Sequence, residues 1–105
     1  MKRGEIWEAE LGGKAGKRAV LILTRSGVIP YLNKVVVAEI TSQSKGYPTQ
    51  IAVGKLSNLS RESFVSAESL HSIPKECLRR YRGELPEELA REVHEAIIFA
   101  LDLLS

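Results

Sequence analysis

The chain has 105 residues, of which 44% are hydrophobic and 27% are charged, and its formal net charge is +2. This balance is typical of a soluble globular protein, and the length predicts one domain spanning residues 1–105. A single cysteine excludes an internal disulfide, and with two distant histidines it leaves no zinc-binding pattern. No apolar run can span a bilayer and no signal peptide is recognisable, so we expect a cytoplasmic protein without a membrane segment.

Charge is distributed unevenly along the chain. Residues 1–61 carry ten Lys/Arg and four Glu, a net +6, whereas residues 62–105 carry five Lys/Arg and nine Asp/Glu, a net −4. The basic front half indicates an anionic partner, and solvated loop charges are the alternative explanation.

Hydrophobic patterns predict a series of short strands. Alternation over residues 5–11 predicts a half-buried strand with Trp7, Ala9 and Leu11 on its core face, followed by a basic, glycine-rich loop. The continuous apolar run 18–24 predicts a strand buried on both faces. Residues 25–33 and 55–61 read as connections, and 74–78 as one helical turn. The remaining expected strands are 34–40, 49–53, 63–66, 70–73 and an edge strand over 78–85.

A C-terminal helix is expected to open with Pro86 at its first position and Glu87 and Glu88 in its first turn. Apolar residues then recur at three- and four-residue spacing. They are Leu89, Val93, Ala96, Ile97, Ala100, Leu101 and Leu104. Strands followed by one helix predict a small, strongly bent sheet or barrel capped by that helix.

The stretch from Val35 to Pro48 changes abruptly from apolar to polar at Thr41. Hydroxyls, an amide and an ammonium at the end of a buried strand could bind an anion at the sheet's rim. On chemistry alone, an ordinary polar loop is the favoured interpretation. Arg18 likewise reads as a solvated strand-edge charge or as a guanidinium fixed at the rim.

Other charged and titratable side chains allow similar alternatives. The arginines at 79, 80 and 82 could contact phosphate or protect an edge strand from pairing. His71 and His94 read as surface or packing residues rather than metal ligands.

Four motifs together resemble the MazF/PemK (Kid-like) toxin family of type II toxin–antitoxin systems. They occur in order along nearly the whole chain. They are Gly4-Glu5-Ile6-Trp7, Lys17-Arg18-Ala19-Val20-Leu21-Ile22-Leu23, Ile40-Thr41-Ser42-Gln43-Ser44-Lys45-Gly46-Tyr47-Pro48 and Gly83-Glu84-Leu85-Pro86-Glu87-Glu88-Leu89.

The resemblance implies an SH3-like barrel of five to seven strands with a C-terminal helix, assembled as a homodimer. It implies sequence-specific cleavage of single-stranded RNA without metal or cofactor, and inhibition by a MazE-like antitoxin. The family's catalytic arginine and threonine fall on Arg18 and Thr41. The residues expected to hold RNA are Lys14, Lys17, Ser42, Gln43 and Lys45.

Two positions depart from the family pattern. Ala19 replaces the proline that follows the catalytic arginine in many members, and Gly13 stands where some relatives carry a glutamate that could act as general base. Another group would then serve as base, or alignment and Arg18 would suffice. Two further hypotheses therefore stay open: a non-enzymatic toxin that inhibits a protein such as gyrase, and an RNA-binding barrel without chemistry.

Overall fold

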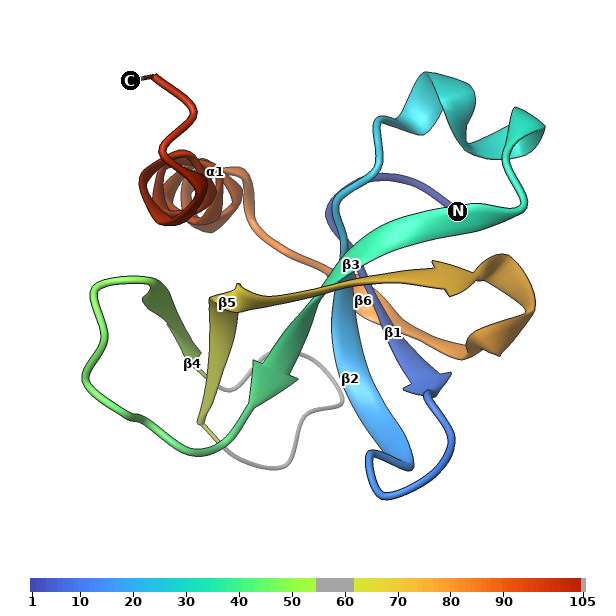
Figure 1. Ribbon diagram of the computed structural model, residues 1–105, viewed down its shortest axis with the longest axis horizontal. Helices are drawn as coiled ribbons and strands as arrows, with labels where there is room; N and C mark the ends of the chain where they lie inside the picture. The colour runs from blue at the N-terminus through green and yellow to red at the C-terminus, as the bar shows by residue number, and fades with distance from the viewer. Residues whose placement is uncertain (55–61, 105) are drawn as a thin grey trace.

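The computed structural model describes residues 1–54 and 62–104, so the connection expected over 55–61 lies outside the described residues. Within the described chain, six strands and two short 3₁₀ helices precede one α-helix (Figure 1). Their bounds are β1 Glu5–Glu10, β2 Lys17–Ile22, η1 Ser26–Tyr31, β3 Lys34–Thr41, β4 Gln50–Gly54, β5 Ser63–Pro74, η2 Lys75–Cys77, β6 Leu78–Glu84 and α1 Glu87–Leu101.

The strands form one antiparallel sheet in the order β4-β5-β3-β2-β1-β6. The mainly β architecture with a C-terminal helix is thereby confirmed, and so is the expected number of strands. β6 lies at one end of this order, as its charged sequence predicts for an edge strand. The other end is β4, and the sheet curls strongly between the two (Figure 1).

The prediction of two separate strands over 63–66 and 70–73 is wrong, because both belong to the single strand β5. The strand turns a corner near its middle (Figure 1). Its first part pairs with β4 and the end of β3, and its second part pairs with the start of β3. Ala38 pairs with Leu70 but Ile40 pairs with Val65, so β5 carries extra residues at this corner. Such an insertion bends a strand without ending it.

Alternating side chains on the central strands bury two hydrophobic clusters, one on each face of the sheet. The first cluster includes Ile6, Leu21 and Ala38 and is covered by α1. The second includes Ala9, Val20, Ile22, Val35 and Val37, with Trp7 and Leu11 packed against it. The expected face of Trp7, Ala9 and Leu11 is thus confirmed, and β2 is buried on both faces as predicted.

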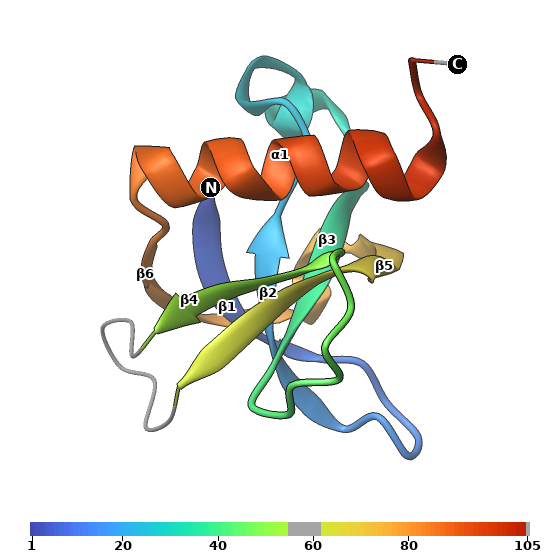
Figure 2. The ribbon, with the colours of Figure 1, turned by 90° about the vertical axis from the view of Figure 1, so that its left-hand side faces the viewer.

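Helix α1 packs against β4 and β5 and runs across the sheet (Figure 2). Pro86 is the residue before the helix rather than its first residue, and Glu87 and Glu88 lie in the first turn. The helix ends where Asp102 adopts a left-handed conformation with φ 54°. Leu104 therefore lies beyond the helix and is exposed, so the expected apolar stripe contacts the core only through its first half.

Two connections are more ordered than the sequence suggests. Strand β2 ends at Ile22 instead of Thr24, because the Thr24 hydroxyl accepts a hydrogen bond from the Val36 N–H at 2.7 Å. The connection 25–33 contains η1, which buries Ile29 against the second cluster. The expected helical turn near Pro74 is η2. No helix among the described residues is long and apolar enough to cross a membrane.

Candidate active site

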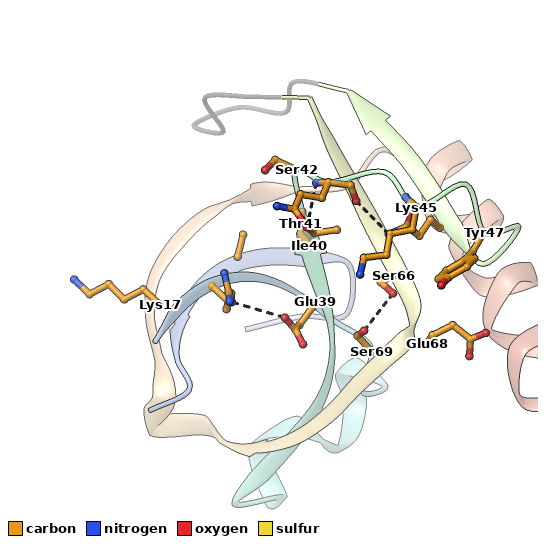
Figure 3. A pocket seen from close by; sticks show the side chains of 14 residues that line it. Lys17, Glu39, Ile40, Thr41, Ser42, Lys45, Tyr47, Ser66, Glu68 and Ser69 are labelled. Carbon is orange, nitrogen blue, oxygen red and sulfur yellow. Dashed lines mark hydrogen bonds and ion pairs between the residues drawn. The ribbon is translucent and has the colours of Figure 1, made fainter. Parts of the chain in front are cut away.

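A polar hollow of about 580 Å³, hereafter the rim hollow, opens where β2 and β3 leave the second hydrophobic cluster (Figure 3). Most of its walls come from the ends of these strands, the β3–β4 loop and the corner of β5. The lining residues are Lys17, Arg18, Ala19, Glu39, Ile40, Thr41, Ser42, Gln43, Lys45, Tyr47, Gln50, Ser66, Glu68 and Ser69.

Arg18 and Thr41 are brought together by strand register. Ala19 pairs with Ile40, so Arg18 and Thr41 occupy the next positions on the two antiparallel strands. Both belong to the face that buries Val20 and Val37, because side chains two residues apart share a face. This face is apolar along most of each strand and becomes polar only at the rim. The buried part of each strand therefore fixes where the two polar side chains lie.

The Thr41 hydroxyl is oriented by its own loop. Its Oγ1 accepts a hydrogen bond from the Gln43 N–H at 3.1 Å. A hydroxyl has one hydrogen to donate and two lone pairs to accept with, so the Thr41 O–H can still donate to another group. The arrangement suits a donor aimed at a phosphate oxygen.

Glu39 is the carboxylate beside Arg18. The Arg18 Nε lies 3.9 Å from Glu39 Oε1, and His71 Nε2 lies 2.6 Å from Glu39 Oε2. The Arg18 side chain is 49% exposed and the Glu39 side chain 28%. The contact between the two groups is made by Nε, at a distance longer than a hydrogen bond. Two parallel nitrogens match the geometry of phosphate oxygens.

The β3–β4 loop is held to β4 by Gln50. Its Oε1 accepts a hydrogen bond from the Lys45 N–H at 2.7 Å, and its Nε2 donates to the Gln43 carbonyl at 3.3 Å. These bonds hold the backbone of the polar stretch against the sheet. Figure 3 shows the Lys45 side chain directed into the rim hollow.

Most of the predicted site residues lie around the rim hollow. Arg18, Thr41, Lys17 and Lys45 line it, together with Ser42 and Gln43. Lys17 extends its ammonium end away from the other side chains (Figure 3). Lys14 lies on the exposed turn between β1 and β2 and is not among the lining residues.

The sequence reasoning missed Glu39, Gln50, Ser66, Glu68 and Ser69. A signal existed for Glu39, which is the one charged residue within the apolar run from Val35 to Ile40. The others lie in segments with no periodic pattern, and the corner of β5 brings three of them to the wall.

A second Arg–Glu pair lies in a small depression next to the rim hollow. Arg82 Nη2 donates to Glu8 Oε2 at 2.8 Å, and both residues line a small depression that also includes Arg18. The hydrogen bond from Arg82 lowers the pKa of the Glu8 carboxyl below its usual value. In residues 1–54 and 62–104, no group of three or more His, Cys, Asp or Glu side chains is arranged to hold a metal ion.

Comparisons with known proteins agree with this fold. Residues 2–101 match the family described as PemK-like, MazF-like toxin of type II toxin–antitoxin system. Endoribonuclease MazF3 of Mycobacterium tuberculosis is 40% identical over 86 residues, which is 82% of this chain and 84% of the relative. Probable endoribonuclease MazF5 of the same species is 30% identical over 101 residues, 95% of this chain and 92% of the relative.

Solved structures of toxins and endoribonucleases have the same fold as this chain. The M. tuberculosis toxin MazF-mt6 superposes with a TM-score of 0.86 at 37% identity, covering 93% of this chain and 96% of that chain. A mycobacterial endoribonuclease in complex with its cognate antitoxin superposes with a TM-score of 0.89 at 25% identity, covering 100% and 98%. A bent six-strand sheet with a C-terminal helix is thus the architecture of a toxin endoribonuclease. The chain belongs to the PemK-like, MazF-like toxin family of type II toxin–antitoxin systems.

Proposed function

We propose that the chain cleaves single-stranded RNA at the rim hollow, at specific sequences, without a metal ion. The observation that carries this proposal is the pairing of β2 with β3, which sets Arg18 and Thr41 at adjacent rim positions. RNA supplies its own nucleophile, the 2′-hydroxyl, next to the scissile phosphate. A protein then needs to align the attack and stabilise the additional negative charge of the phosphorane.

Arg18 is assigned to charge stabilisation. Its guanidinium is a permanent cation that can donate two parallel hydrogen bonds to the nonbridging oxygens. The Thr41 O–H donates to a phosphate oxygen, with Gln43 fixing the direction of the hydroxyl. The 2′-oxygen displaces the 5′-oxygen, so the products carry a 2′,3′-cyclic phosphate and a 5′-hydroxyl.

The test uses purified protein and a long single-stranded RNA in EDTA. We expect cleavage at a few defined sites, with 5′-hydroxyl ends at every site when the products are mapped. Arg18→Ala should abolish cleavage under the same conditions. Intact RNA with the wild-type protein, or equal cleavage by the variant, would contradict the proposal. Growth arrest with intact RNA would instead favour inhibition of a protein such as gyrase, and binding without product would favour a non-catalytic RNA-binding barrel.

We further propose that the protein acts in the cytoplasm as a homodimer and is neutralised by a MazE-like antitoxin. The support for the antitoxin is the mycobacterial relative solved with its cognate antitoxin. The support for a dimer is a group of exposed apolar side chains at the end of α1 and just after it, where Phe99, Leu101 and Leu104 are 70%, 51% and 85% exposed. Light scattering should give twice the monomer mass of 11.6 kDa, and addition of the antitoxin should suppress cleavage.

A further inference from the structure

The proposed RNA cleavage needs a group that removes the proton from the 2′-hydroxyl, and Gly13 cannot provide one. We propose that Glu39 is this general base and that His71 is the positioning residue that holds its carboxylate. This inference rests on the proposed function, and it adds the base and its support to the Arg18 and Thr41 pair.

The geometry places Glu39 beside the two residues already assigned. On β3, Glu39 and Thr41 are two residues apart and share the face that lines the rim hollow. On β2, Val20 pairs with Glu39, and Arg18 lies two residues before Val20 on the same face. A phosphate held by Arg18 and Thr41 therefore lies next to the Glu39 carboxylate. General-base catalysis requires such proximity to the nucleophile.

His71 supports Glu39 from the other side. Val37 pairs with His71, so the imidazole stands on the same face as Glu39 and one pair further along the sheet. Its Nε2 donates to Glu39 Oε2 at 2.6 Å. A carboxylate is an acceptor only, so this contact fixes the protonated nitrogen of the imidazole. The second oxygen, Oε1, faces Arg18 at the longer distance of 3.9 Å and is the oxygen assigned to take the proton.

The charged groups that face Glu39 come from three parts of the chain. Arg18 and Lys17 come from β2, Lys45 comes from the β3–β4 loop, and His71 and Glu68 come from β5. Glu68 is the other carboxylate lining the rim hollow, and it accepts a hydrogen bond from the Thr49 hydroxyl at 3.4 Å. The like-charged neighbour is therefore tied to Thr49 at the end of the β3–β4 loop, whereas Glu39 contacts Arg18 and His71.

Glu39 Oε1 accepts the proton of the 2′-hydroxyl while the 2′-oxygen forms its bond to phosphorus. The bond from phosphorus to the 5′-oxygen breaks, its electron pair stays on that oxygen, and water supplies the proton that makes the 5′-hydroxyl. Glu39 then returns its proton to water.

The central experiment compares Glu39→Gln with the wild type in single-turnover cleavage across a range of pH. The variant keeps the size of the side chain and its acceptor for His71 but loses basicity. We expect the single-turnover rate constant to fall by about 100-fold or more. RNA binding should be equal or tighter, because a negative charge has been removed from an RNA site. The wild-type rate should rise with pH on the acidic side, and this rise should be absent in Glu39→Gln.

Glu68→Gln is the matched control, because it removes the same charge from the same hollow. Its cleavage should keep the pH dependence of the wild type. A substrate with sulfur in place of the scissile 5′-oxygen tests whether Glu39 acts as the general base or as the general acid. A thiolate leaves with little need of protonation, so such a substrate does not depend on an acid. Glu39→Gln should stay slow on this substrate, and recovery to the wild-type rate would assign Glu39 as the acid and overturn the proposal.

The role of His71 is tested by a pair of substitutions. His71→Ala should lower kcat by about 10- to 100-fold with little change in KM, as expected for a misplaced catalytic group. His71→Gln retains a side-chain N–H donor and should restore much of the loss. Wild-type cleavage with an unaffected Glu39→Gln variant would refute the base assignment alone, whereas absence of wild-type cleavage would refute the proposed function itself.

Discussion

Two arginine–glutamate pairs lie near each other on this sheet and differ in the distance between their charged groups and in the exposure of the arginine. Arg82 and Glu8 are 2.8 Å apart, and their side chains are only 22% and 26% exposed. Arg18 and Glu39 are 3.9 Å apart, and the Arg18 side chain is 49% exposed. Glu8 is matched closely by its partner, whereas Glu39 is shared between Arg18 and His71.

The difference separates a structural pair from the pair that we propose to be catalytic. In the first pair the guanidinium is committed to a carboxylate, which joins the edge strand β6 to β1. In the second pair the guanidinium is half exposed and contacts its carboxylate at 3.9 Å through Nε. Close pairing of Arg18 would have to be broken each time RNA binds, with a cost in binding free energy.

Substituting each arginine tests this comparison with the largest expected effect. Arg18→Ala should lower the cleavage rate by about 10²–10³-fold or more, because donors that stabilise the charge of the phosphorane are lost. Arg82→Ala should stay within a few-fold of the wild-type rate. Single-turnover kinetics on one RNA, with circular dichroism to confirm folding, provides the measurement. Equal losses in the two variants would mean that the distance between the charged groups does not distinguish their roles.

A smaller effect is expected for the lysines, and it tests where RNA lies relative to the two pairs. Lys45→Gln should weaken RNA binding and reduce the slope of log affinity against log salt concentration by about 0.7, the value for one phosphate contact on a single strand. Lys14→Gln removes the same charge on the turn outside the rim hollow, so a smaller change is expected. Binding isotherms on a 2′-deoxy substrate at several salt concentrations measure both. A larger change for Lys14 would shift the RNA path toward the β1–β2 turn.

Much of the fold could be predicted because the central strands carry their own patterns. Alternation places Trp7 and Ala9 on one face, and the apolar run of β2 indicates burial on both faces. The corner of β5 could not be predicted, because Ser66, Glu68 and Ser69 are polar residues within a strand that stays extended. The bend in the sheet brings these side chains to the wall of the rim hollow, and no local sequence pattern encodes that bend.

The candidate site also has a part that could be predicted from the sequence and a part that could not. Arg18 and Thr41 could be found from the sequence, because each stands where an apolar strand becomes polar and both match a family motif. The contact between Glu39 and His71 joins residues 32 positions apart and exists only because Val37 pairs with His71. A histidine that appears isolated in the sequence thus becomes the partner of a carboxylate through strand register.

The Glu8–Arg82 pair gives the smallest expected effect, which is a dependence of stability on pH. Because Arg82 lowers the pKa of Glu8 in the folded state, the unfolded chain binds the Glu8 proton more tightly. The stability from this pair is therefore complete above the pKa of Glu8 in the unfolded chain, and it is lost as the pH falls through the lower pKa of the folded state. Solvent screening around these side chains keeps the contribution small.

Urea denaturation of the wild type and Glu8→Gln at several pH values measures this contribution. The wild type should be the more stable protein near neutral pH, and the difference in unfolding free energy should shrink toward zero in acid, where protonated Glu8 resembles glutamine. A difference that is the same at both ends of the range would show that Arg82 stabilises neither form of Glu8 preferentially. The cleavage rate at neutral pH should change little, since we assign the chemistry to Arg18 and Glu39 and not to this pair.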